Sequence, residues 1–182
     1  MSKLLSVEQV ALVRGGRLLF EDFGLALGPS EGVHVTGPNG SGKSSLIRMI
    51  AGLLRPSAGR IERASVALAD EGLALDRELP LGRALRFWGG AGLDEALAAF
   101  DLERLADVPV RLLSTGQAKR ARLARVMASG AKLWLLDEPL NGLDRDGIAR
   151  LDAALAGHRA SGGAVVAASH AALGGEWREV TL

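Results

Sequence analysis

Cysteine is absent from this sequence of 182 residues. Its absence excludes disulfides, thiolate metal sites and a thiol nucleophile. A marked excess of one charge is missing too, because the formal net charge is only +1. Proteins that bind nucleic acid normally carry a strongly basic face, so we expect no nucleic-acid partner.

Long apolar runs are also missing. No stretch reaches the ~20 apolar residues that span a bilayer. Glu8 and Gln9 interrupt the apolar N-terminal run too early for a signal peptide. Hydrophobic residues make up 48% of the chain and charged residues 24%, which is ordinary globular composition. We expect one soluble, cytoplasmic domain over residues 1–182 that reaches a membrane only through a partner.

Residues 37–44 fit the phosphate-binding pattern G-x-x-x-x-G-K-[ST] at every fixed position. The pattern predicts a strand at 32–36 and an apolar helix at 45–53, so the turn aims main-chain N–H groups and the positive helix end at one point. We therefore expect a bound nucleoside triphosphate, with Lys43 on the β- and γ-phosphates and Ser44 on Mg²⁺. The predicted nucleotide-binding residues of this stretch are Gly37, Pro38, Asn39, Gly40, Ser41, Gly42, Lys43, Ser44 and Ser45.

The residues before and just after this loop predict further strands. Residues 4–20 alternate loosely and break at Gly15-Gly16, which indicates a hairpin. Residues 23–27 indicate another strand. Residues 60–68 begin as a strand after a Pro- and Gly-containing turn.

The second half of the chain changes character. Apolar spacing is helical from Leu81 to Phe100, and the helical segment is expected to run to about Ala128. Residues 131–136 and 164–169 predict buried strands, with an amphipathic helix at 147–158 between them. This order predicts an α/β fold: a P-loop NTPase core with a mainly parallel sheet, an antiparallel β segment at the N-terminus and a helical subdomain. The predicted lobes are a core at about 1–70 and 129–182 and a helical lobe at about 71–128.

Two carboxylates, Asp137 and Glu138, follow the apolar run at 133–136. A strand buried on both faces delivers such residues at its C-terminal end, where ligands bind in parallel sheets. Asp137 suits a water-mediated hold on the Mg²⁺ that Ser44 also binds. Glu138 suits a general base that orients the attacking water. The alternative is an ordinary strand end.

The stretch Ser114, Thr115, Gly116 and Gln117 precedes a basic helical stretch at 118–125. By itself it predicts either a helix N-cap or an anion site. Together with the P-loop and the Asp-Glu strand end, it resembles the ATP-binding subunits of ABC transporters, whose signature sequence is LSGGQ. Thr115 departs from the third signature position. The resemblance implies a helical lobe of the ABC type and a signature that faces the P-loop of a second subunit.

The same resemblance assigns two further segments. Residues 141–144 look like the D-loop, which lies between two ATPase subunits in that family. His170 looks like the switch histidine that contacts the γ-phosphate, so the implied catalytic residues are Glu138, His170 and Lys43. The other two histidines have no such role: we interpret His34 as a strand residue and His158 as a solvated helix residue.

The segments at 17–27, 107–110, 131–139 and 146–151 resemble one subfamily, the ATPase of the haem-exporter-type complex of bacterial cytochrome c biogenesis. This resemblance implies integral membrane partners, a homodimer on ATP binding, and a peripheral position on the cytoplasmic face of the inner membrane. The alternatives are a nucleotide-gated assembly factor, another non-transport ABC ATPase, and a transporter subunit for another substrate.

Two positions depart from the family pattern, and the role of one aromatic pair stays open. An aromatic residue usually stacks on adenine near position 14, where this chain has Arg14; its guanidinium either stacks instead or is solvated. The hinge glutamine is replaced within residues 69–72, so Glu71 or Asp70 occupies the hinge, and Glu71 is a third candidate Mg²⁺ residue. Phe87 and Trp88 either line a partner groove or, as we expect, pack in the core.

Overall fold

Five parallel strands form the central sheet of the computed structural model, which describes residues 3–72 and 74–182. The strand order is β5-β6-β7-β3-β8, and each neighbouring pair is parallel. Strands β3, β6 and β7 are buried almost throughout, which explains their continuous apolar runs. The strands are β3 (Gly32–Thr36), β5 (Val66–Ala69), β6 (Leu133–Asp137), β7 (Ala164–Ala168) and β8 (Arg178–Thr181). The predicted α/β fold with a mainly parallel sheet is confirmed.

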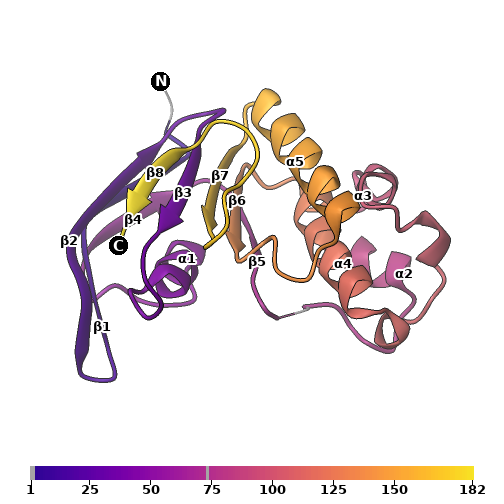
Figure 1. Ribbon diagram of the computed structural model, residues 1–182, viewed down its shortest axis with the longest axis horizontal. Helices are drawn as coiled ribbons and strands as arrows, with labels where there is room; N and C mark the ends of the chain where they lie inside the picture. The colour runs from indigo at the N-terminus through magenta and orange to yellow at the C-terminus, as the bar shows by residue number, and fades with distance from the viewer. Residues whose placement is uncertain (1–2, 73) are drawn as a thin grey trace.

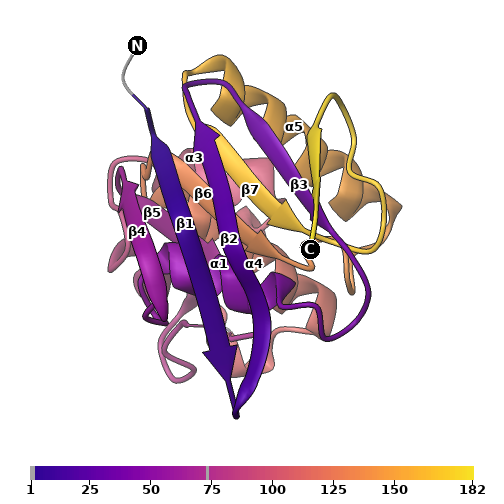
Figure 2. The same cartoon turned by 90° about the vertical axis from the view of Figure 1, so that its left-hand side faces the viewer.

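An antiparallel sheet of order β2-β1-β4 lies in front of the parallel sheet in Figure 2. Its strands are β1 (Leu5–Arg14), β2 (Arg17–Leu27) and β4 (Ala58–Arg63). Helix α1 (Lys43–Ala51) lies between the two sheets in Figure 1. Its buried side chains belong to one hydrophobic cluster with both sheets. The P-loop helix is therefore held from two sides.

Two strand predictions were wrong in detail, and one strand was missed. Residues 23–27 are not a separate strand, because β2 continues through Asp22, where φ is 49° and the register with β1 shifts. Residues 60–68 split into β4 and β5, which lie in different sheets. Strand β8 was missed, since it is short and mostly exposed and therefore lacks an apolar pattern.

The helical lobe lies on the right of Figure 1. The expected helical run at 81–100 is interrupted at Gly89, where an added Cβ would lie 1.9 Å from the Ala128 carbonyl oxygen. The chain thus passes close to the C-terminal end of α4. The helices are α2 (Leu81–Arg86), α3 (Leu93–Ala99), the 3₁₀ turns η1 (Glu103–Leu105) and η2 (Val110–Leu112), and α4 (Thr115–Ala128), followed in the core lobe by α5 (Arg145–Ala160).

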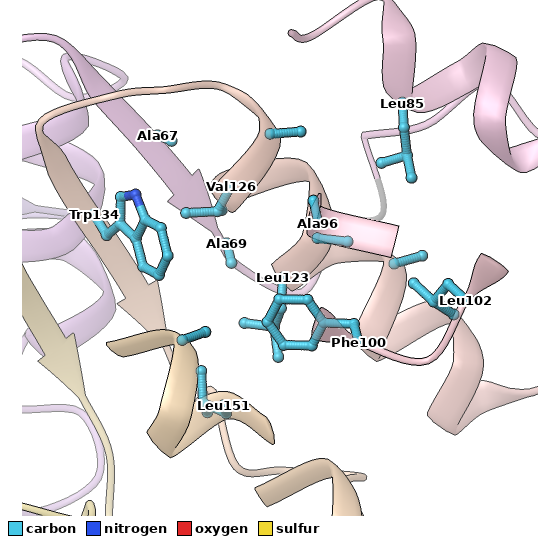
Figure 3. Packing of buried hydrophobic residues seen from close by; sticks show 14 of the residues in the cluster. Ala67, Ala69, Leu85, Ala96, Phe100, Leu102, Leu123, Val126, Trp134 and Leu151 are labelled. Atoms are coloured by element: carbon cyan, nitrogen blue, oxygen red, sulfur yellow. The ribbon is translucent and has the colours of Figure 1, made fainter. Parts of the chain in front are cut away.

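One hydrophobic core connects the two lobes. Figure 3 shows Trp134 of β6 and Leu151 of α5 in one cluster with Leu123 of α4 and with Phe100. Both Phe100 and Leu123 are almost fully buried. The predicted lobes at 1–70 with 129–182 and at 71–128 therefore share packing. Met1, Ser2 and Leu73, which the predicted ranges include, lie outside the described residues.

Two predicted side-chain environments were wrong. His158 is not solvated: its ring stacks on Trp134 with centroids 4.0 Å apart and planes 10° apart, and burial lowers its pKa. Phe87 does not pack in the core, since it is 84% exposed. Trp88 is half-exposed, with the Arg125 guanidinium 4.6 Å from its ring centre. Among residues 3–72 and 74–182, no helix has the length and apolar content to cross a membrane.

Candidate nucleotide-binding site

The P-loop follows β3 directly and ends where α1 begins at Lys43. Gly37, Gly40 and Gly42 all have positive φ angles, of 136°, 81° and 111°. A Cβ on Gly37 would lie 2.6 Å from the Leu182 carbonyl oxygen, so this position tolerates no side chain. The glycines thus give the loop a curvature that other residues could not adopt.

The Lys43 ammonium lies within this curve. Its Nζ donates to the carbonyl oxygens of Gly37 at 2.7 Å and Pro38 at 3.0 Å. Ser41 Oγ is buried and, in the part of the chain that the structure describes, has no hydrogen-bond partner. A buried cation and an unpaired hydroxyl in one loop fit an anion such as a phosphate.

A hydrogen bond joins the end of the P-loop to the end of β6. Ser44 Oγ donates to Asp137 Oδ1 at 3.0 Å, and Asp137 is 5% exposed. Burial raises the pKa of Asp137, while the Ser44 hydrogen bond opposes the rise. A hydroxyl and a carboxylate are ligands that Mg²⁺ prefers. The described residues contain no cluster of three or more His, Asp or Glu side chains that would form a different metal centre.

Glu138 and His170 face each other at the ends of β6 and β7. His170 Nε2 lies 3.6 Å from Glu138 Oε1. Glu138 has a φ of 47°, a left-handed conformation that is uncommon for a residue with a side chain. Such strain is found where a side chain must be aimed at a site.

A cavity of about 460 Å³ brings most of the predicted residues together. Arg14 reaches this cavity from the β1–β2 hairpin, and its Nη1 donates to Ser45 Oγ at 3.3 Å. The lining residues are Arg14, Leu19, Asn39, Gly40, Gly42, Lys43, Ser44, Ser45, Glu138, Asn141 and His170. Leu19 was not predicted, and Asn141 was predicted only as part of the D-loop.

Glu71 stands apart from this group. It is exposed, and its main-chain carbonyl accepts from Arg122 Nη1 at 2.7 Å. Asp70 acts on Asp137 through its charge, which adds to burial and to the charge of Glu138 in raising the pKa of Asp137. The role of Glu71 in metal binding stays a prediction.

Ser114, Gly116 and Gln117 of the predicted signature line a different, smaller cavity of about 240 Å³, and Thr115 does not. Ser114 caps α4: its Oγ accepts from Gln117 N, and the Gln117 side chain accepts from Ser114 N. Gly142 and Asp144 of the predicted D-loop line the same cavity. The signature and the P-loop of one chain therefore border separate spaces.

Sequence reasoning missed three cations of α4, of which Lys119 and Arg125 are buried and Arg122 is half-buried. Lys119, Arg122 and Arg125 donate to the carbonyl oxygens of Glu138, Asp70 and Leu68. Their spacing of three residues places them on one helix face, which is the signal that was available. They attach α4 to the C-terminal edge of the parallel sheet.

A P-loop on a parallel sheet, an Asp-Glu strand end and a Ser-x-Gly-Gln helix start on a separate lobe define an ABC-type ATPase. The family model described as "ABC transporter" matches residues 20–141. The chain belongs to this family and is an ATP hydrolase of the ABC transporter type.

Relatives match nearly the whole chain. A protein of Sphingopyxis alaskensis called cytochrome c biogenesis ATP-binding export protein CcmA is 57% identical, over 95% of this chain and 93% of its own length. A protein of the same name from Novosphingobium aromaticivorans is 59% identical, over 88% of this chain and 85% of its own length.

Solved structures agree with the fold. An ATP-binding subunit of an ABC transporter is 26% identical with a TM-score of 0.85, covering 92% of this chain and 79% of its own. The protein cbiO1 of Clostridium perfringens, part of the ABC transporter complex cbiONQ, is 26% identical with a TM-score of 0.78, covering 94% and 80%.

Proposed function

We propose that this chain is the ATP-binding and ATP-hydrolysing subunit of a cytochrome c biogenesis export complex. The names of the relatives that match it over most of their length support this assignment. Two copies would bind MgATP between them and act on integral membrane subunits at the cytoplasmic face of the bacterial inner membrane.

The observation that carries the proposed chemistry is the 3.0 Å contact between Ser44 Oγ and Asp137 Oδ1. It joins the P-loop to the strand end that presents Glu138. The substrate phosphates and the attacking water would thus meet at one place in the cavity. Mg²⁺, when bound by Ser44 and through water by Asp137, supplies positive charge to the phosphate oxygens.

The protein residues have separate tasks in this scheme. Lys43 and the P-loop N–H groups hold the phosphates and stabilise the charge that develops on them. Glu138 orients the attacking water and accepts its proton. His170, beside Glu138, contributes a donor to the γ-phosphate. Arg14 would lie beside the nucleotide, because it already bonds to Ser45 next to the P-loop.

Glu138→Gln tests the general base. We expect MgATP binding to persist and hydrolysis to fall by about 10²-fold or more, because the amide cannot accept the proton. Glu103→Gln, a change at an exposed glutamate of η1, is the matched control and should hydrolyse ATP as the parent does. A Glu138→Gln protein with parental activity would rule out Glu138 as the base.

The assignment to cytochrome c biogenesis has its own test. Deleting the gene in its host should abolish covalent haem in c-type cytochromes, measured by haem staining. The parent gene should restore the staining, whereas Lys43→Ala should not, since it removes the ammonium of the P-loop. Normal cytochromes in the deletion strain would overturn this assignment and leave the ATPase activity untouched.

A further inference from the structure

Lys119 is a buried cation on α4, two residues after the signature. It is 5% exposed, and its Nζ donates to the Glu138 carbonyl oxygen at 2.7 Å. A buried ammonium is costly unless its hydrogen bonds are satisfied. The ammonium donates to the main-chain oxygen of the proposed base itself, so an ordinary packing role does not account for it.

Glu138 needs such a partner, because its backbone is in the left-handed region at φ 47°. Its N–H donates to the Ala168 carbonyl oxygen at 2.8 Å, and its carbonyl oxygen also accepts from Asn141 N at 3.3 Å. Lys119 therefore adds a second and shorter bond to the Glu138 carbonyl oxygen, and both polar main-chain atoms of Glu138 are held. Since φ and ψ fix the direction of the Cα–Cβ bond, these bonds aim the carboxylate at the cavity beside His170.

The neighbouring cations of α4 reach a different strand. Arg122 donates to the carbonyl oxygens of Asp70 at 2.8 Å and Glu71 at 2.7 Å, and Arg125 donates to that of Leu68. These three acceptors lie at the end of β5. Of this row, Lys119 is the cation that reaches the end of β6, where Glu138 stands.

We propose that Lys119 is a positioning residue that fixes the main chain of Glu138 and ties it to the signature helix. The inference rests on the proposed role of Glu138 as the base. Because the signature would serve the partner's nucleotide, Lys119 would connect the base of one site with the signature of the other. If α4 shifts when its signature binds the partner's nucleotide, Lys119 would then move the main chain of Glu138 with it.

Lys119→Met is the main test, because methionine keeps the apolar stem and removes the ammonium. We expect kcat for MgATP to fall by about 10- to 100-fold, the cost of a misplaced catalytic group, with KM changed less than about twofold. The unfolding temperature should stay level or rise, since a buried charge is lost. Lys119→Arg, which keeps a donor, should recover much of the activity, and the exposed Lys132→Met should equal the parent.

Glu138→Gln separates this proposal from the proposed base. If Lys119 acts through Glu138, adding Lys119→Met to Glu138→Gln should lower the residual single-turnover rate less than about twofold. A full further loss would overturn the positioning role. So would parental activity of Lys119→Met, a joint loss of activity and unfolding temperature, or no recovery in Lys119→Arg. Parental activity of Glu138→Gln would instead refute the base itself.

Discussion

Burial changes the pKa values of two charged residues at the candidate nucleotide-binding site. Asp137 and Lys119 are both nearly inaccessible, and burial raises the pKa of the first and lowers that of the second. Burial disfavours the charged form in each case. Ser44 compensates Asp137 with a hydrogen bond, and the Glu138 carbonyl does so for Lys119.

Lys119 gives a prediction for alkaline stability. Burial, and then the nearby Arg122, lower its pKa from 10.5 to about 8, while Asp137, Glu138 and Glu71 oppose the shift. Between these values the unfolded chain binds the proton and the folded chain does not, so the free energy of unfolding should rise with pH. The rise should approach about 3 kcal/mol at pH 10.5.

The measurement is urea unfolding of the parent and of Lys119→Met from pH 7.5 to 10.5. The difference between the two proteins isolates Lys119, because other lysines titrate in both. The chain has no cysteine and no tyrosine, so few other side chains titrate in this range. A difference that stays constant with pH would contradict the lowered pKa.

At the scale of elements, α4 combines two functions. A capping box at Ser114 and Gln117 begins the helix, and the cations Lys119 and Arg122 attach it to the parallel sheet. The cap satisfies main-chain N–H groups of the first turn, while the Ser114 hydroxyl remains at the surface. A cap and a phosphate contact can therefore occupy the same position.

Two substitutions at Ser114 separate its role as a helix cap from its proposed contact with the partner's phosphate. Ser114→Ala removes the cap and should lower the free energy of unfolding by about 1 kcal/mol. Ser114→Asp keeps a capping oxygen, and so the stability, but its negative charge should repel the partner's phosphate and abolish hydrolysis. Thermal unfolding and ATPase assays on both proteins provide the check. Full activity of Ser114→Asp would reduce Ser114 to a cap.

At the scale of the whole molecule, the nucleotide cavity and the signature cavity are separate, and we propose that a second copy completes each of them. The P-loop lines one cavity and the signature lines another, with no residue in common among the described lining residues. A homodimer would pair each P-loop with the partner's signature. The core shared between the lobes would keep these two surfaces in a fixed relation.

Mixing two inactive proteins tests this pairing. Lys43→Ala should damage the P-loop and Ser114→Arg the signature, so each homodimer has two defective sites. In a heterodimer one site receives both defects and the other none. With random pairing, activity should recover to roughly a quarter of the parent value if the sites are independent. No gain over the separate mutants, with heterodimers shown to be present, would refute shared sites.

Much of this protein could be predicted from the sequence because its signals are local. Glycine spacing specifies the P-loop, and apolar runs specify the buried strands β6 and β7. Ser114 and Gln117 mark the start of α4 because a capping box involves neighbouring residues only. Strand bends were harder to predict. Residues 23–27 read as a separate strand, but β2 is continuous through Asp22 because both parts pair with β1.

The tertiary structure decided what depends on residues distant in the chain. Phe87 is exposed and His158 is stacked on Trp134, whereas we expected from the sequence that Phe87 packs in the core and that His158 is solvated. Arg14 reaches Ser45 of α1 from the β1–β2 hairpin, 31 positions away, and Lys119 reaches Glu138 across 19 positions. The sequence by itself determined the nucleotide chemistry, since phosphate binding needs a contiguous loop. Folding decided how that loop, the base and the signature helix are connected, because those contacts exist only once the sheet has brought the strand ends together.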